Sequence, residues 1–157
     1  MKIFITVGTH PQPFDRLLEE IDSIAENKKY EIFAQTGCSS YKPKRFKSEK
    51  LLTPEKGLSI MKKSGIIITH AGAGSIIDAC KAGKPLIVVP RLQKFNEHTN
   101  NHQLELAEAV EGIGKAICVK DIKKLEAAVK RAEKFKPKTR EKNKIVERIN
   151  DFLEGLE

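Results

Sequence analysis

The chain has 157 residues, a formal charge of +8, 39% hydrophobic residues and 32% charged residues. This composition is typical of one folded domain and excludes a fibrous or intrinsically disordered protein. No apolar run approaches the roughly 20 residues that span a bilayer, and the N-terminal segment MKIFITV is too short for a signal peptide. We therefore expect a single domain over residues 1–157 that stays in the cytoplasm.

Apolar β-rich runs alternate with helical periodicity along the chain. Strands are expected at residues 3–7, 31–36, 65–69, 86–89 and 115–119, with a weaker run at 46–52. Helices are expected at 13–27, 54–63, 75–82, 99–111, 122–135 and 139–156. This alternation predicts an α/β fold with a doubly wound, mostly parallel sheet, in which ligands bind at the carboxyl ends of the strands.

The excess positive charge lies in the C-terminal third, where residues 120–148 contain 12 Lys and Arg against 5 Asp and Glu. Such a face fits an acidic protein, an anionic membrane surface or nucleic acid, or is simply a solvated helix face. No nucleic-acid-binding motif accompanies it, so we expect no nucleic acid partner. The apolar positions of the helix in residues 137–157 fit either docking on a partner or packing on the chain's own sheet.

A glycine turn follows the buried run that ends at Thr69. Gly72, Ala73, Gly74 and Ser75 open the next helix, whose free N–H groups and dipole favour an anion such as a nucleoside diphosphate. Tight packing of that helix on the sheet is the alternative explanation of the glycines. Loops that follow parallel strands lie together at the carboxyl edge of the sheet. Two further loops are therefore expected beside this glycine turn, namely Gly8-Thr9-His10 and the polar segment 91–103.

Three cysteines, at positions 38, 80 and 118, lie far apart without metal-ligand spacing. An odd number of cysteines in a reducing compartment indicates free thiols. No aspartate pair is placed to bridge a metal ion to a diphosphate. We therefore expect neither a metal ion nor a cofactor.

The motifs HAGAGS at 70–75, GKPLIVVP at 83–90 and NHQ at 101–103 together resemble the nucleotide-sugar-binding half of glycosyltransferase family 28. The opening FITVGT at 4–9 with PFDRL at 13–17 is similar to the small catalytic subunits of split bacterial exopolysaccharide glycosyltransferases and of the eukaryotic dolichol-linked N-acetylglucosaminyltransferase. The resemblance implies a Rossmann-like domain, the donor-binding half of a glycosyltransferase B fold.

The resemblance also implies roles for individual residues. The donor diphosphate would meet the N–H groups of Ala73, Gly74 and Ser75, assisted by Gly8 and Thr9. Asp78 would bind the ribose, although an acid early in a helix is also favoured by the dipole alone. The uracil pocket would lie near residues 52–54.

The donor sugar would contact His102 and Gln103, with Asn100 and Glu97 as further candidates, unless Asn101 caps the helix and His102 only packs beneath it. His70 is either a partly positive imidazole beside the phosphates or a structural histidine at a strand end.

The implied activity is that of a UDP-sugar-dependent hexosyltransferase that inverts the anomeric carbon without a metal ion, with His10 as a candidate general base. Because the chain carries only the donor half, the resemblance implies a membrane-anchored partner subunit that binds a polyprenyl-diphosphate-linked acceptor and holds this chain at the inner face of the membrane. A nucleotide-binding regulatory or assembly subunit without transferase activity is the alternative. A dehydrogenase-like epimerase is disfavoured because a dinucleotide fingerprint and a Tyr-x-x-x-Lys pair are absent.

Overall fold

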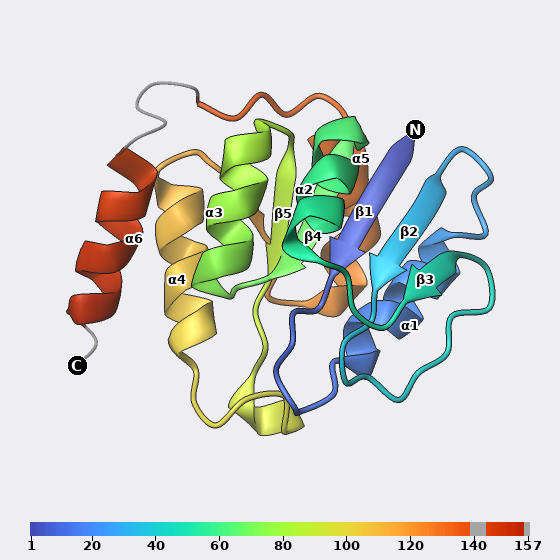
Figure 1. Cartoon of the computed structure of the whole chain (residues 1–157), viewed down its shortest axis with the longest axis horizontal. Coiled ribbons are helices and arrows are strands. Elements are labelled where there is room, and N and C mark those ends of the chain that lie inside the picture. Colours follow the sequence, from blue (N-terminus) through green and yellow to red (C-terminus); the bar gives the residue numbers. More distant parts are fainter. Residues whose placement is uncertain (139–143, 156–157) are drawn as a thin grey trace.

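The computed structural model describes residues 1–138 and 144–155 and contains one six-stranded sheet (Figure 1). Its strand order is β3-β2-β1-β4-β5-β6, and every neighbouring pair is parallel. The strands are β1 (Lys2–Thr6), β2 (Glu31–Gln35), β3 (Lys47–Glu49), β4 (Ile66–His70), β5 (Leu86–Val89) and β6 (Ile117–Cys118). The expected doubly wound α/β fold is confirmed.

Helices cover both faces of the sheet (Figure 1). One face packs against α1 (Asp15–Ile24) and α5 (Leu125–Ala132), and the other packs against α2 (Pro54–Lys63), α3 (Ala73–Ala82), α4 (His102–Gly112) and α6 (Lys144–Glu154). The central strands β4 and β5 are buried along their whole length, as parallel strands between two helical layers must be. No helix in residues 1–138 or 144–155 is long and apolar enough to cross a membrane.

Several helices and strands begin or end at other residues than the sequence predicts. The helix expected at 122–135 starts as a 3₁₀ turn, η2 (Ile122–Lys124), and the Asp121 side chain caps it by accepting a hydrogen bond from Lys123 N. A second 3₁₀ turn, η1 (Gln93–Phe95), was not expected and ends at Asn96 with φ of 56°. The weak run at 46–52 forms only the exposed edge strand β3. The first part of the helix expected at 139–156 lies outside the described residues.

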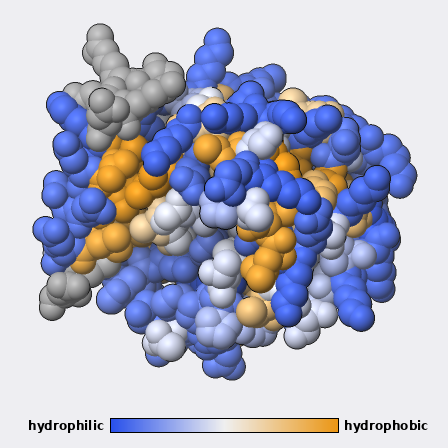
Figure 2. All heavy atoms as spheres, in the orientation of Figure 1, coloured by the Kyte–Doolittle hydropathy of each residue, from blue (hydrophilic) through white to orange (hydrophobic). Residues whose placement is uncertain are grey.

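The C-terminal helix α6 packs within the chain. Ile145 and Ile149 are buried in the same cluster as α3 and α4, with Val146 and Phe152 partly buried against it. Apolar side chains on this face of the molecule gather in two patches, one along α6 and one beside α2 (Figure 2). The apolar side of α6 thus packs on the chain's own fold. Docking of the remaining surface of α6 on a partner stays a prediction.

Replacement of Ile149 by Ala is expected to lower the free energy of unfolding by about 2–4 kcal/mol, because it leaves a cavity against α3. The matched control Leu153→Ala, at a position 37% exposed on the same helix, should cost less than about 1 kcal/mol. Urea denaturation of the two variants measures the difference. Equal stabilities would show that α6 does not pack on the domain in solution.

Candidate functional site

A cavity of about 320 Å³ opens at the carboxyl edge of the sheet, between α2, α3 and the loop after β1. It brings together seven of the predicted site residues, namely Gly8, Thr9, His70, Gly72, Gly74, Ser75 and Asp78. The residues expected to form the base pocket, Leu52, Thr53 and Pro54, line it as well. Among the described residues that line the cavity there is no Lys or Arg, so any anion there would have to be bound by backbone groups.

The N-terminus of α3 faces this cavity with its first N–H groups uncapped. The N-cap residue is Gly72, so no side chain there accepts a hydrogen bond from the first turn. A Cβ added at Gly74 would meet no atom within 4 Å, which shows that this position is open. Ala73, predicted to supply an N–H group, has a side chain that packs against the core instead of lining the cavity.

Two glycines of the site make room for the imidazole of His70. A Cβ at Gly8 would lie 2.4 Å from His70 Cε1, and one at Gly72 would lie 2.3 Å from His70 Nε2. Gly8 also has φ of 76°, a conformation that side chains rarely adopt. Packing therefore explains these two glycines, whereas it gives no reason for Gly74.

The His70 imidazole is neutral at pH 7, which favours the structural histidine of the two alternatives, while its contact with the donor phosphates stays a prediction. His70 as a residue is 7% exposed, and this burial, with the nearby Arg91 charge, lowers the pKa of its imidazole to about 4. The His70 ring packs between the loops of Gly8 and Gly72, and the residue lines the cavity. Sequence reasoning left both alternatives open because burial of a strand-end side chain depends on the loops that cover it.

Asp78 lies on the cavity wall in the second turn of α3, one turn after Ser75. The helix dipole acts mainly within the first turn, so it gives little reason for an acid at this position. The Asp78 carboxylate is exposed and makes no hydrogen bond or ion pair with any residue in the described ranges. It is therefore available to accept hydrogen bonds from a ligand.

Behind the cavity, Arg91 holds the loops after β1 and β5 together, a role that sequence reasoning missed. Its side chain is fully buried. It donates to the carbonyl oxygens of Val7 at 2.6 Å, Gln12 at 2.7 Å and Glu97 at 3.2 Å. The sequence does hint at this role, because Arg91 directly follows a buried strand and Pro90. A charged side chain that is buried at such a position must make hydrogen bonds to acceptors such as backbone carbonyl oxygens.

Glu97 is not free to bind a sugar. Its carboxylate accepts two hydrogen bonds from Arg16, at 2.8 and 2.9 Å, and one from Leu92 N at 3.0 Å. Arg16 in turn stacks over the exposed ring of Phe95, 4.7 Å from its centroid. This bidentate pair fastens the segment after β5 to α1.

The predicted sugar-binding residues lie outside the lining of the cavity. Gln103 is buried, and its Oε1 accepts a hydrogen bond from Arg91 N at 3.1 Å. Asn100 Oδ1 accepts from His102 N at 3.1 Å, so Asn100 shapes the start of α4. The Asn101 side chain makes no capping bond and accepts from Gln93 N instead. The contacts of Asn100, His102 and Gln103 with a donor sugar stay predictions.

His10, the candidate general base, stacks on His98 from the loop after β5, with ring centroids 4.6 Å apart. Its Nδ1 accepts a hydrogen bond from Gln12 N at 3.2 Å. Burial and the Arg91 charge lower the His10 pKa from its ordinary value. His10 therefore lies at the carboxyl edge but outside the lining of the cavity that holds Asp78.

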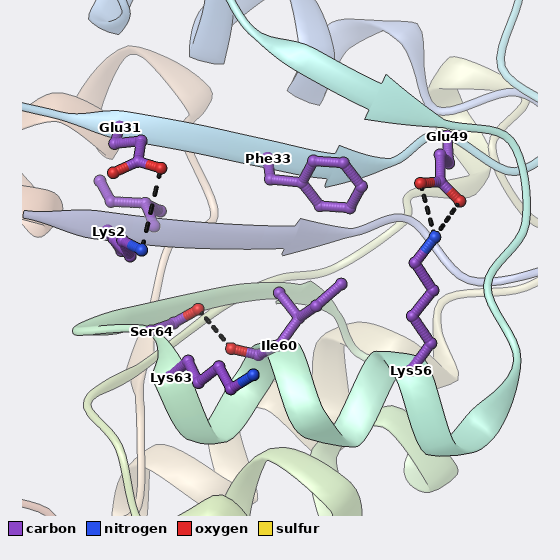
Figure 3. Close-up of a pocket in the computed structure, with 9 residues that line it drawn as sticks. Lys2, Glu31, Phe33, Glu49, Lys56, Ile60, Lys63 and Ser64 are labelled. Atoms are coloured by element: carbon purple, nitrogen blue, oxygen red, sulfur yellow. Dashed lines mark hydrogen bonds and ion pairs between the residues drawn. The ribbon is translucent and has the colours of Figure 1, made fainter.

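A different cavity, of about 300 Å³, lies between α2 and the strands β1 to β3 (Figure 3). Phe33 of β2 and Ile60 of α2 line it from opposite sides. Four of its charged side chains are already paired, since Lys56 contacts Glu49 at 2.7 Å and Lys2 contacts Glu31 at 3.9 Å. It contains none of the predicted site residues, so the cavity at the carboxyl edge is the better candidate. No cluster of three metal-ligating side chains occurs in the described parts of the chain.

His70 should make stability depend on pH. Its folded pKa of about 4 lies below the unfolded value of 6.5, so the unfolded chain takes up a proton first as pH falls. The stability that the neutral His70 contributes is fully present above pH 6.5. As the pH falls from 6.5 to 4, the free energy of unfolding should decrease by up to about 3 kcal/mol. Urea denaturation at several pH values should show this loss for the wild type and a smaller loss for His70→Gln. Equal losses in both proteins would contradict a neutral, buried His70.

Comparison with known proteins agrees with this architecture. The sequence model of the glycosyltransferase family 28 C-terminal domain matches residues 2–156. The human UDP-N-acetylglucosamine transferase subunit ALG13 is 34% identical over 121 residues, which cover 68% of this chain and 10% of that protein. A UDP-N-acetylglucosamine--N-acetylmuramyl-(pentapeptide) pyrophosphoryl-undecaprenol N-acetylglucosamine transferase from Prochlorococcus marinus is 33% identical over 104 residues, covering 63% of this chain and 28% of that enzyme.

The fold is also that of known structures. The solution structure of ALG13 superposes with a TM-score of 0.64 at 18% identity, and the match covers 94% of each chain. The match spans only about a tenth of the human relative's length. Since the family model matches nearly the whole sequence, this chain belongs to the glycosyltransferase family 28 C-terminal domain.

Proposed function

We propose that the chain is the UDP-sugar-binding catalytic subunit of a heteromeric glycosyltransferase. Family membership and the names of the two relatives support a UDP-sugar donor. The observation that carries the proposal is the arrangement of one cavity at the carboxyl edge of the sheet. An uncapped helix N-terminus, an unpaired carboxylate and the apolar start of α2 line it together.

The diphosphate would lie against the first turn of α3. The N–H groups of Gly74 and Ser75 point out of the helix end, and the dipole adds a partial positive charge there. The buried guanidinium of Arg91 adds positive potential from behind the wall. These fixed donors would stabilise the negative charge that develops on UDP as it leaves, which is electrostatic preorganisation.

The nucleoside would extend along the cavity from this point. The Asp78 carboxylate would accept hydrogen bonds from the ribose hydroxyls, because its oxygens are unpaired and face the cavity. Leu52 and Pro54 would pack on the base at the start of α2. In this pose, the sugar would leave the cavity toward the loops after β1 and β5.

The reaction would transfer a hexose or N-acetylhexosamine to a polyprenyl-diphosphate-linked acceptor, with inversion and without a metal ion. A membrane-anchored partner subunit would bind the acceptor and keep this chain at the cytoplasmic face of the membrane. The general base is then expected on the partner or acceptor side. His10 is poorly placed for this role, because its Nδ1 is occupied by Gln12 N.

Isothermal titration of the chain with UDP, CDP, GDP and ADP tests the donor assignment. We expect selective UDP binding and a loss of about 10- to 100-fold in Asp78→Ala, since hydrogen bonds to a charged group contribute about 1.5–3 kcal/mol. The control Asp151→Ala removes an exposed acid on α6 and should leave the affinity unchanged. Unselective binding, or equal effects of the two substitutions, would refute the proposed nucleotide site.

The substitution Gly74→Ala should change the stability of the domain and its affinity for UDP in opposite directions. The added methyl group meets no described atom within 4 Å beyond its own helix backbone and chain neighbours, and Ala is the better helix former, so stability should rise by up to about 1 kcal/mol. The same methyl group projects from the helix end where the diphosphate is placed, so UDP affinity should fall about tenfold, or ~1.4 kcal/mol. Thermal unfolding and titration calorimetry on one sample measure both effects. Unchanged affinity would place the diphosphate elsewhere.

A further inference from the structure

Two imidazoles from different loops form a stacked pair at the carboxyl edge. His10 comes from the loop after β1 and His98 from the loop after β5, and their ring planes lie 29° apart at a centroid distance of 4.6 Å. Neither histidine lines the cavity assigned to the nucleotide. The pair therefore offers polar groups that the proposed nucleotide site does not use.

Both rings are fixed in the same way by their own loops. Gln12 N donates to His10 Nδ1 at 3.2 Å, and Asn100 N donates to His98 Nδ1 at 3.4 Å. A neutral imidazole whose Nδ1 accepts a hydrogen bond carries its proton on Nε2. Burial, together with the Arg91 charge, lowers the pKa of both histidines, which favours this neutral form. The pair then presents two Nε2–H donors.

The charge around the pair favours an anion. Within residues 1–138 and 144–155, the hydrogen bonds of the buried Arg91 guanidinium all go to backbone carbonyl oxygens. The neighbouring Glu97 carboxylate is matched by Arg16 at 2.8 Å. Arg16 pairs with the Glu97 carboxylate, whereas Arg91 makes hydrogen bonds to neutral carbonyl groups, so the positive charge of Arg91 is not matched by an ion pair of its own in the described residues. A ligand atom that meets two N–H donors in this field should be an acceptor that carries negative charge, such as a phosphate oxygen.

We propose that His10 and His98 together bind a phosphate or diphosphate group of a second substrate, each donating its Nε2–H to a phosphate oxygen. The assignment of that group to the acceptor rests on the proposed function, because the nucleotide diphosphate is placed at α3. His10 is then an anion-binding donor. This role agrees with its occupied Nδ1 better than a general-base role does.

The test uses the full chain with ¹⁵N-labelled histidine and inorganic pyrophosphate as the probe. Long-range ¹H–¹⁵N spectra at pH 7.5 should show the Nε2–H tautomer for both histidines. With UDP at saturation to fill the nucleotide site, pyrophosphate should shift the Nε2 resonances of His10 and His98 together. The opposite tautomer, or no shift while UDP binds, would overturn the inference and leave the proposed function intact.

Variants show whether the two rings make the site. His98→Phe keeps a stacking ring but removes both nitrogens, so pyrophosphate affinity should fall at least tenfold while UDP affinity is unchanged. Lys94→Ala removes an exposed positive charge from the same loop and serves as the control. Equal losses in the two variants would indicate diffuse attraction and overturn the inference.

Two further outcomes separate this inference from the proposed function. If UDP alone shifts both histidines as strongly as pyrophosphate, the pair belongs to the donor site and the second-substrate assignment is wrong. If no nucleotide binds, but pyrophosphate still shifts the pair and His98→Phe abolishes the shift, the anion site stands and the proposed function fails.

Discussion

The guanidinium of Arg91 connects the loops that follow β1 and β5, and the geometry of the whole carboxyl edge depends on this connection. Its carbonyl partners come from both loops, from Val7 and Gln12 on one side and Glu97 on the other. Burial costs the cation enough to lower its pKa to about 10, so it remains charged at neutral pH. Removal of the side chain would leave several buried carbonyl oxygens without donors, each of which costs about 1–3 kcal/mol.

The buried charge of Arg91 would contribute to the proposed binding of anions at a cavity whose described lining residues include no Lys or Arg. Arg91 contributes to the lowered pKa of His10, His70 and His98, so the three imidazoles stay neutral around it. The positive potential comes from one fixed group and from the α3 helix end, whose positions are set before a ligand arrives. Such donors need little reorganisation when negative charge develops on a leaving group.

The fold could be predicted from the sequence because strand and helix periods alternate and the glycine turn marks the switch from β4 to α3. The seven lining residues followed from the family motifs, and the topology of a parallel sheet gathers their loops. The roles of Glu97, Gln103 and His70 could not be predicted in the same way. Each depends on a partner distant in sequence: Arg16 for Glu97, Arg91 for Gln103, and the Gly8 loop for His70. Pairing of this kind appears only once the loops are placed in space.

The central claim is that one cavity, between α2 and the N-terminus of α3, holds the nucleotide diphosphate. An experimental structure of the chain with UDP bound tests it most directly. The account predicts diphosphate oxygens within hydrogen-bond distance of the Gly74 and Ser75 N–H groups and the ribose hydroxyls at the Asp78 carboxylate. A diphosphate bound at the stacked pair of His10 and His98, with the first turn of α3 unoccupied, would contradict it.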